Sequence, residues 1–399
     1  MNILVICQYY EPEPFRIHEL CRELVKRGHR VRVVTGMPNY PQGDRYPGYE
    51  ENRVREEEKD GVQIVRLPIH PRKTGALHRF WNYYSYVHQS KRYVSGRLAR
   101  NGEAFDLVFV YQLSPVMMAR AGLRYAKKYG LPLLMYTLDL WPESLRAGGV
   151  ARVSAVYRLY HGVSGHIYRA ADRILVTSGQ FAPYLSREFD VPETRLRCLP
   201  QFADALFTPL PAKPREEVLK LLFAGNVGLY QHLDTVLEAA ELLRSEPVEF
   251  QIAGDGSELE RLRQLARQRE LQNVFFLGRR PVEEMPELYA QADALLVTMI
   301  RDPFISLTLP GKVQSYLAAG KPVLGAIDGE AARVIREADC GFCGPAEDAA
   351  ALAENVRKLM ACPDLGPLGR SAAQYYSRHF SLDRFMQALE EELLALKKE

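Results

Sequence analysis

The sequence predicts an α/β protein of two domains, each built on a parallel sheet with helices on both faces. Short apolar runs alternate with segments whose apolar residues recur every three or four positions, a pattern typical of buried strands and amphipathic helices. A proline-dense stretch that follows neither period, residues 201–217, separates two such series. A length of 399 residues also suits two domains.

The first series opens with a β-α-β unit. Residues 2–7 form a short apolar run, residues 17–25 carry one apolar helical stripe, and Gly28 ends that helix before a strand at 31–35. Further strands are predicted at 62–67, 106–111, 132–137 and 173–178.

The second series follows the proline-dense linker with the same alternation. We therefore place one domain at 1–200 and another at 218–370, and we expect the helices at 371–399 to pack back on the first domain. Sheets of this kind bind ligands at the carboxyl ends of their strands, so we expect the two to face a central cleft. Strands are predicted at 220–225, 248–254, 273–278, 294–299 and 322–327.

Composition excludes several classes of protein. The formal net charge of +3 is too small to indicate a nucleic-acid-binding protein. No apolar run approaches the ~20 residues of a membrane span, and the chain opens on a strand without a signal peptide, so we expect a cytoplasmic protein. We expect the six cysteines to be reduced. No D-x-D cluster in a suitable loop indicates a metal site.

Two glycine-containing turns in the second domain are candidate phosphate sites. Gly225 and Gly228 follow a predicted strand and precede a helix, where backbone N–H groups can approach an anion; the alternative is a turn that needs glycine for steric reasons. Lys312 stands in the first turn of a helix that Gly311 opens. The helix dipole disfavours a cation there unless an anion neutralises it, so we predict diphosphate binding rather than a solvated lysine.

Three further strand ends carry polar residues. Glu330 begins a helix, where it serves as a dipole partner or as an acceptor for a sugar hydroxyl, the former being favoured. Gly278 is followed by Arg279 and Arg280. These residues could bind the edge of a nucleotide base, or they could be ordinary solvated charges. For Gly254 we favour ordinary turn chemistry.

In the first domain, Asp139, Trp141 and Glu143 follow the strand at 132–137. Carboxylates at the carboxyl end of a strand suit catalysis or acceptor binding, although Asp139 can equally cap a helix. Arg16 and His18 lie in the loop after the first strand, and Tyr40 belongs to a rigid loop after the second.

Aromatic and basic residues are interleaved between Arg72 and Arg100. A helix with Trp81, Tyr84 and Arg92 suits an anionic bilayer surface, where aromatic rings lie at headgroup depth. The alternative is a helix packed on its own sheet through these aromatic residues.

Taken as whole strings, these segments resemble family four of the retaining glycosyltransferases, which have the GT-B fold. Within it they are most similar to bacterial transferases that build capsule, O-antigen and exopolysaccharide precursors, including the N-acetyl-L-fucosamine transferase group. The resemblance spans nearly the whole chain. It rests on ICQYYEPEPFRIHELCRELVKRGHRVRVVTGMPNYPQG, YTLDLWPESL, FAGNVGLYQHLDTVLEAA, IAGDG and LPGKVQSYLAAGKPVLGAIDGE.

The chain departs from this family at two places. The two glutamates of the E-x7-E motif are replaced by Leu307 and Ser315, and the usual Arg and Lys of the first glycine turn fall near Asn226 and Gln231. The resemblance then implies the following roles. Asp139, Glu143 and His18 would be catalytic; Gly225, Asn226, Gly228, Gln231, Arg301, Lys312 and Glu330 would bind the donor's diphosphate and sugar; Gly254, Arg279, Arg280 and Ser315 would bind the base or ribose; and Arg16, Tyr40 and Trp141 would bind the acceptor.

The resemblance implies a retaining, metal-independent transferase that moves a sugar, expected to be an N-acetylated amino sugar, from a UDP-sugar to a polyprenyl-diphosphate-linked glycan. The first domain would bind the acceptor and the second the nucleotide-sugar. No cofactor is implied beyond the donor substrate. We expect a peripheral protein on the inner face of the cell membrane. A UDP-sugar 2-epimerase of the same fold and a donor-binding pseudoenzyme are the alternatives.

Overall fold

The computed structural model describes all residues except 42, 74, 147–148, 212–213, 215 and 399. The chain divides into two compact units, one of residues 1–199 with 386–399 and the other of residues 200–385. The helices expected to return to the first domain from residue 371 therefore do so only from Met386, and residues 371–385 belong to the second unit.

The first unit contains an eight-stranded sheet in the order β3-β4-β2-β1-β5-β6-β7-β8. Neighbouring strands are parallel, apart from the antiparallel pair β3 and β4. The central strands are apolar and buried on both faces, whereas β3 reads REEEK and lies at the edge. The strands are β1 (Asn2–Ile6), β2 (Arg30–Gly36), β3 (Arg55–Lys59), β4 (Val62–Leu67), β5 (Leu107–Gln112), β6 (Leu133–Thr137), β7 (Arg173–Val176) and β8 (Leu196–Cys198).

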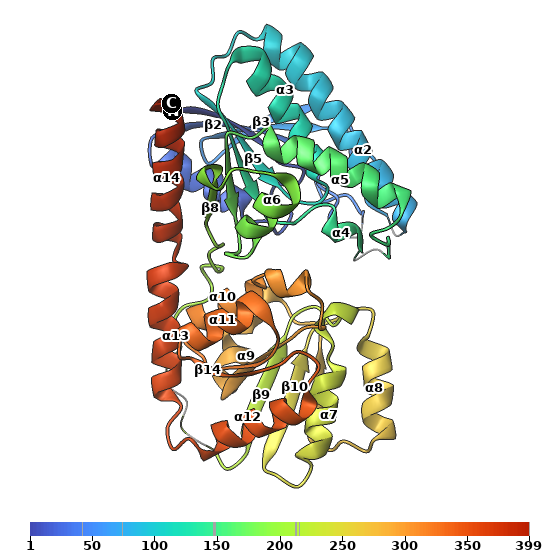
Figure 1. The fold of residues 1–399 in the computed structure, drawn as a ribbon, viewed down its shortest axis with the longest axis vertical. Coiled ribbons are helices and arrows are strands. Elements are labelled where there is room, and N and C mark those ends of the chain that lie inside the picture. The colour runs from blue at the N-terminus through green and yellow to red at the C-terminus, as the bar shows by residue number, and fades with distance from the viewer. Residues whose placement is uncertain (42, 74, 147–148, 212–213, 215, 399) are drawn as a thin grey trace. The chain divides into compact units, whose positions relative to one another are not determined.

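Helices cover this sheet, with α2, α3 and α5 together on one side of it in Figure 1. The predicted stripe of α1 is buried at Ile17, Leu20 and Leu24. Ser154 caps α5 by accepting a hydrogen bond from the backbone N–H of Tyr157. The helical elements are α1 (Ile17–Lys26), α2 (Ala76–Tyr93), η1 (Val94–Leu98), η2 (Val116–Ala119), α3 (Arg120–Tyr129), α4 (Glu143–Arg146), α5 (Ala155–Arg169), α6 (Phe181–Phe189) and η3 (Glu193–Arg195).

The C-terminal helix α14 (Leu382–Lys398) supplies the last segment of the first unit. It buries Met386, Leu389, Leu393 and Leu396, a spacing that keeps one helical face apolar. Ion pairs join the same helix to the rest of the unit, between Arg27 and Glu390 at 2.8 Å, between Arg173 and Glu392 at 3.1 Å, and between Asp106 and Lys397 at 3.2 Å.

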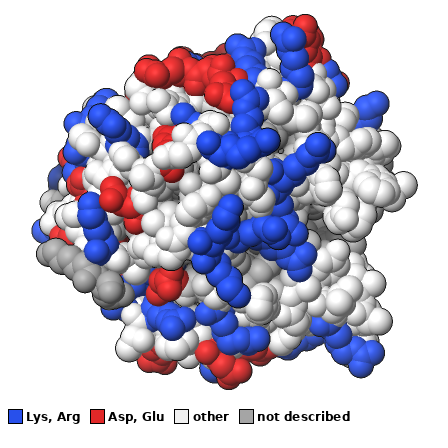
Figure 2. Space-filling view, turned by 90° about the horizontal axis from the view of Figure 1, so that it is seen from above, with Lys and Arg blue, Asp and Glu red and all other residues white. Residues whose placement is uncertain are grey.

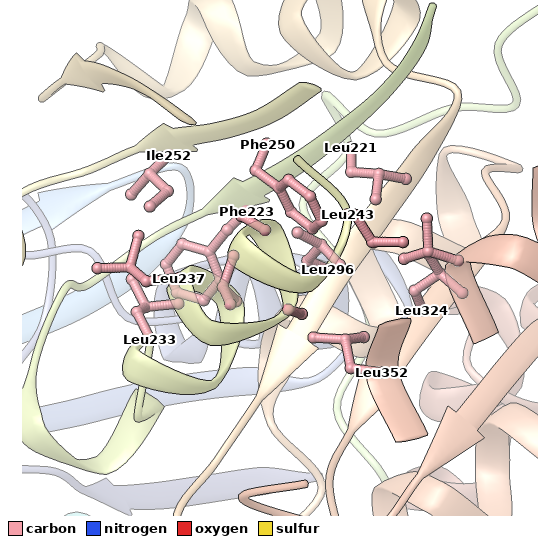
Figure 3. Packing of buried hydrophobic residues seen from close by; sticks show 14 of the residues in the cluster. Leu221, Phe223, Leu233, Leu237, Leu243, Phe250, Ile252, Leu296, Leu324 and Leu352 are labelled. Atoms are coloured by element: carbon pink, nitrogen blue, oxygen red, sulfur yellow. The ribbon is translucent and has the colours of Figure 1, made fainter. Parts of the chain in front are cut away.

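The second unit contains a six-stranded parallel sheet in the order β11-β10-β9-β12-β13-β14. Alternate residues of a strand point to opposite faces, so Leu221 and Phe223 enter one core (Figure 3) and Leu222 and Ala224 enter the other. The strands are β9 (Leu219–Ala224), β10 (Val248–Ala253), β11 (Val274–Gly278), β12 (Ala294–Thr298), β13 (Val323–Ala326) and β14 (Gly341–Gly344).

Helices α7, α8 and α12 contribute to the core of Figure 3, and α9, α10, α11 and α13 to the core on the other face. None of the described helices of the chain combines the length and apolar composition needed to cross a membrane. The helical elements are η4 (Leu229–Gln231), α7 (Asp234–Leu242), α8 (Leu259–Gln268), η5 (Val282–Glu284), α9 (Met285–Gln291), η6 (Ile305–Leu307), α10 (Gly311–Ala318), α11 (Gly329–Glu337), α12 (Ala349–Ala361) and α13 (Gly366–His379).

Candidate functional site

At three strand ends of the second unit, the backbones of glycine residues pack closely against one another. Gly225 after β9 and Gly254 after β10 have φ values of +138° and +153°, which an L side chain rarely adopts. A Cβ at Gly254 would lie 1.8 Å from the carbonyl oxygen of Gly225. The N–H of Gly254 in turn donates to the oxygen of Gly278 at 2.8 Å. Close backbone packing therefore accounts for Gly254 without a ligand.

The turn after β9 is closed by its own polar side chains. The Oε1 atom of Gln231 accepts hydrogen bonds from the Nδ2 atom of Asn226 at 3.1 Å and from the backbone N–H of Gly228 at 3.2 Å. The two neutral residues of the expected donor site are thus in contact. Their hydrogen bonds fix the shape of the turn that Gly225 begins.

The ammonium of Lys312 lies beside this turn. Its Nζ atom is shielded from solvent although the side chain as a whole is half-buried, and no hydrogen-bond acceptor among the described residues reaches it. It lies 3.6 Å from the centroid of the Phe223 ring, and a Cβ at Gly225 would come within 3.3 Å of it. Burial lowers the pKa of Lys312 from 10.5 to about 7. An anion at this place would supply the missing partner.

Arg301 and Glu330 have partners within the second unit. The backbone N–H of Arg301 donates to Glu347 at 2.9 Å, and its guanidinium donates to the carbonyl oxygen of Ala346 at 2.6 Å. Glu330 is buried at the start of α11 and forms an ion pair with Arg333 at 2.7 Å. Glu330 therefore pairs with a side chain of its own helix, and its expected role as a dipole partner or as an acceptor for a sugar hydroxyl stays a prediction.

The residues expected near the base lie further along the same edge. Arg279 and Arg280 are exposed after β11, the edge strand of the sheet, and Arg280 is 3.7 Å from Glu284. Ser315 lies one turn into α10 and donates to the oxygen of Gly311 at 3.3 Å. None of these contacts involves the turn at Gly225.

Asp139 lies at the carboxyl end of β6, in the first unit. Its Oδ2 atom accepts hydrogen bonds from the backbone N–H of Ser114 at 3.1 Å and from the Ser114 hydroxyl at 2.9 Å. Burial raises the pKa of Asp139, and the bonds from Ser114 oppose that rise. Ser114 follows β5, so Asp139 joins the ends of two strands instead of capping the first turn of α4.

Trp141 and Glu143 are held in the interior of the first unit. The indole N–H of Trp141 donates to the Ser114 hydroxyl at 2.8 Å. Trp141 therefore contacts the same hydroxyl that donates to Asp139. The Glu143 carboxylate accepts hydrogen bonds from the hydroxyls of Tyr157 and Tyr184. These bonds tie α4 to α5 and α6, so Glu143 has a structural role.

The loop after β1 is fastened to the loop after β2 by Glu13. Its buried carboxylate accepts hydrogen bonds from the backbone N–H groups of Tyr10, Asn39 and Tyr40 at 3.1, 2.8 and 2.8 Å. Burial raises the pKa of Glu13 to about 7, against the effect of these donors. The Tyr40 ring lies under the guanidinium of Arg72 at 5.3 Å.

Arg16 and His18 begin α1 in the same loop region. Arg16 forms an ion pair with Glu19 at 3.2 Å. The Nδ1 atom of His18 is buried and, within the described chain, has no hydrogen-bond partner. The structure brings both residues to the carboxyl end of β1.

A buried polar network lies beside these loops, and the sequence alone does not reveal it. The Nε2 atom of Gln8 donates to Oδ1 of Asn82 at 2.8 Å, and Nδ2 of Asn82 donates to Oδ1 of Asn39 at 3.1 Å and to the oxygen of His70 at 2.6 Å. The partners are 43 and 74 positions apart in two of these bonds, so no local pattern could reveal them. Among the described residues, no group of three or more His, Cys, Asp or Glu could hold a metal ion.

Family models match both halves of the chain. Residues 15–201 match the glycosyl transferase 4-like domain, and residues 211–378 match glycosyl transferases group 1. The chain is 29% identical to a probable glycosyltransferase of Pseudomonas aeruginosa, WbjE, over 66% of this chain and 68% of that protein. It is 26% identical to the putative colanic acid biosynthesis glycosyl transferase WcaI of Escherichia coli K12, over 94% of this chain and 96% of that protein.

A solved structure shares the fold at low sequence identity. The structure of Anabaena Alr3699/HepE in complex with UDP and glucose aligns with 98% of this chain and 99% of its own, at a TM-score of 0.68 and 16% identity. A likeness of this kind concerns the fold, and it agrees with the two parallel-sheet units described above.

Proposed function

Because this chain belongs to the GT-B glycosyltransferases, we propose that it moves a sugar from a UDP-sugar to a polyprenyl-diphosphate-linked glycan in bacterial surface polysaccharide synthesis. The names of the relatives support this setting, since WcaI is assigned to colanic acid biosynthesis. The UDP and glucose of the Anabaena structure support the choice of donor. An N-acetylated amino sugar remains our proposal for the transferred group.

The observation that carries the proposal is the buried ammonium of Lys312 beside the turn at Gly225, which finds no hydrogen-bond acceptor in the described part of the chain. A buried cation without an acceptor is costly, and a diphosphate would provide both the charge and the oxygen atoms that it lacks. The backbone N–H groups of Gly311 and Lys312, at the start of α10, would add to the same site. Lys312 would therefore stabilise the leaving diphosphate as the bond to the sugar breaks.

We assign the acceptor side to the first unit through Asp139. The bonds from Ser114 use one carboxylate oxygen, and among the described residues Oδ1 accepts no hydrogen bond. Burial raises its pKa, which makes the carboxylate a better base. It would orient or deprotonate the acceptor hydroxyl, or support positive charge at the sugar carbon. The acceptor would attack the face that the diphosphate leaves, which retains the anomeric configuration and requires neither a side-chain nucleophile nor a metal ion.

One incubation separates this proposal from its alternatives. The protein is mixed with a panel of UDP-sugars and a polyprenyl-diphosphate sugar, and the lipid and nucleotide fractions are analysed by mass spectrometry. A lipid-linked disaccharide together with free UDP supports the transferase. An epimerised UDP-sugar would support the 2-epimerase, and binding without any product would support the pseudoenzyme. GDP-sugars in the same panel test the choice of nucleotide.

A further inference from the structure

The guanidinium of Arg72, between β4 and α2, is held by uncharged groups. Its Nη1 atom donates hydrogen bonds to the hydroxyl of Tyr83 at 2.8 Å and to that of Tyr9 at 3.1 Å. The ring centroids of Tyr40 and Tyr83 lie 5.3 and 5.4 Å from its Cζ atom. Among the described residues, no carboxylate forms an ion pair with Arg72, and its Nε and Nη2 atoms donate to no acceptor. One edge of the planar guanidinium therefore has no partner within the described chain.

Many arginines of the chain differ from Arg72 in having a carboxylate partner. Lys and Arg are frequent on the surface (Figure 2), and many of them pair with Asp or Glu, as Arg16 does with Glu19 at 3.2 Å. Glu13, the buried carboxylate of the neighbouring loops, accepts hydrogen bonds from three backbone N–H groups instead. The backbone N–H of Arg72 donates to Oδ1 of Asn39 at 2.7 Å. The guanidinium is thus fixed through both its backbone and its side chain, so little conformational entropy is lost when a ligand binds.

Aromatic rings of the loops after β1 and β2 adjoin the same guanidinium. The Phe15 ring lies 5.1 Å from that of Tyr9 and 5.0 Å from that of Tyr40, measured between centroids. Phe15, Tyr40 and Tyr83 are half-buried, so each ring keeps part of its surface accessible. The Tyr83 hydroxyl accepts a hydrogen bond from Arg72 and donates to no described residue. Aromatic surface around one charged group and a hydroxyl donor is typical of a ligand-binding site.

This group of residues lies at the same edge of the sheet as Asp139. Arg72 contacts Tyr9, which follows β1. Asp139 contacts Ser114, which follows β5. The strands β1 and β5 are paired in parallel, and paired strands lie about 4.8 Å apart. An acceptor glycan whose reacting hydroxyl reaches Asp139 can therefore place another of its sugars beside Arg72.

We propose that Arg72, Tyr40 and Tyr83 form a subsite for a carboxylated sugar of the acceptor glycan, such as a uronic acid residue. This inference rests on the proposed transferase function and names the class of acceptor. The Nε and Nη2 atoms of Arg72 would donate to the two carboxylate oxygens, the paired geometry that a planar guanidinium favours. The Tyr40 ring would pack against the sugar ring, and the Tyr83 hydroxyl would donate to one of the sugar's oxygen atoms.

Charge favours a carboxylate over a phosphate at this place. Within the described chain, no second Lys or Arg contacts the rings of Tyr9, Tyr40 or Tyr83. One fixed cation balances the single charge of a carboxylate, whereas the diphosphate of the lipid carries more charge and needs more donors. The subsite would therefore recognise the glycan and not the diphosphate that links it to the lipid.

The first test measures the binding of soluble sugars to the full chain by NMR, with UDP in excess so that the nucleotide site is filled. The wild type should bind methyl glucuronide or methyl galacturonide roughly tenfold more tightly than the methyl glycoside of the matching neutral sugar. Arg72→Gln should weaken the binding of the uronide roughly 10–150-fold, the range for a hydrogen bond to a charged group. No preference for the carboxylated sugar in either pair, or tighter binding of glucose 1-phosphate than of the uronides, would overturn the proposal.

The matched control is Arg169→Gln. The guanidinium of Arg169 also donates to a neutral oxygen, the carbonyl of Phe189 at 3.0 Å, but α5 ends there before β7, at the opposite edge of the sheet. This variant should bind uronides as the wild type does, and an equal loss in both variants would overturn the proposal. Arg72→Lys keeps the charge without the planar fork and should recover only part of the affinity. If Arg72→Gln lowers the melting temperature, Tyr83→Phe tests the same subsite with a smaller change and should weaken uronide binding roughly 2–10-fold.

Steady-state kinetics separate this inference from the proposed function. With a lipid-linked acceptor that carries a uronic acid, Arg72→Gln should raise the KM for the acceptor roughly 10–150-fold and leave kcat and the KM for the UDP-sugar near the wild-type values. Transfer by the wild type together with an unchanged acceptor KM in Arg72→Gln would overturn the subsite and leave the transferase proposal standing. Uronide binding that Arg72→Gln removes, in a protein that forms no product with any donor, would support the subsite and contradict the transferase.

Discussion

At the carboxyl ends of the strands in the first unit, the buried carboxylates are held by donors of the protein itself. Ser114 donates twice to Asp139, and three backbone N–H groups donate to Glu13. At the corresponding edge of the second unit, the ammonium of Lys312 is equally shielded, and the described residues offer it no acceptor. The second edge therefore holds a buried cation without an acceptor among the described residues, whereas the two carboxylates of the first edge have their donors.

Another lysine of the second unit shows that this difference is not a general feature of its interior. Lys321 is buried before β13, and its ammonium donates to the carbonyl oxygens of Ala290 and Ala292 at 3.1 and 2.8 Å. Proteins ordinarily satisfy buried polar groups in this way, because an unsatisfied group costs free energy of folding. Our proposal is that a ligand supplies the acceptor that Lys312 lacks.

The largest expected effect lies on the first edge. Asp139→Asn keeps the shape of the side chain and removes its basicity, so turnover should fall by about 10²–10⁴-fold, the range for general-base assistance. UDP affinity should stay at the wild-type value because the nucleotide is assigned to the second unit. Steady-state kinetics and calorimetry measure the two quantities. Wild-type turnover in Asp139→Asn would remove the residue from the mechanism and make His18 the next candidate.

The second prediction concerns the unpartnered cation. Lys312→Ala should weaken UDP binding by about 1.5–3 kcal/mol, the range for a hydrogen bond to a charged group, which is roughly 10–150-fold in Kd. The control is Lys321→Ala, which should lower the melting temperature and leave the affinity of the folded protein for UDP unchanged. Equal effects of the two variants on Kd would mean that Lys312 acts through the fold.

A smaller effect on turnover is expected at Glu143, although the sequence analysis named it with Asp139 as a candidate catalytic residue. Glu143→Ala leaves the buried hydroxyls of Tyr157 and Tyr184 without their shared acceptor, so the unfolding free energy should fall by about 1–3 kcal/mol. Turnover per folded molecule should remain near that of the wild type. Urea unfolding and kinetics test this, and a hundredfold loss of turnover at unchanged stability would return Glu143 to the catalytic group.

The architecture was largely predictable because buried parallel strands read as apolar runs. The strands expected at 62–67 and 173–178 correspond to β4 (Val62–Leu67) and β7 (Arg173–Val176). The strands that were not predicted from the sequence lack that pattern. All five residues of the edge strand β3 are charged, and β14 is only four residues long with two glycines. Edge positions relax the requirement for apolar residues, so composition alone does not reveal them.

The candidate site was predictable only in part, for a related physical reason. Gly225 and Lys312 stand at strand and helix ends that topology brings to one edge, so both could be found from local patterns. What their side chains contact depends on tertiary packing. The sequence did not show that Gln231 closes its own turn, that Trp141 donates to Ser114, or that Asn82 joins a network with Gln8. The roles assigned to all the site residues, Lys312 and Asp139 included, remain predictions.

The central claim is that the ammonium of Lys312, which has no hydrogen-bond acceptor among the described residues, binds a diphosphate. With a pKa of about 7, it is mostly neutral at pH 8 in the free protein, and a bound diphosphate would raise that pKa and draw in a proton. Calorimetry of UDP binding at pH 8, in buffers of different ionisation enthalpy, measures this uptake directly. The account predicts that the wild type takes up close to one proton per UDP and that Lys312→Met takes up none and binds more weakly. Tight binding of UDP by the wild type without proton uptake, or the same uptake in Lys312→Met, would contradict it.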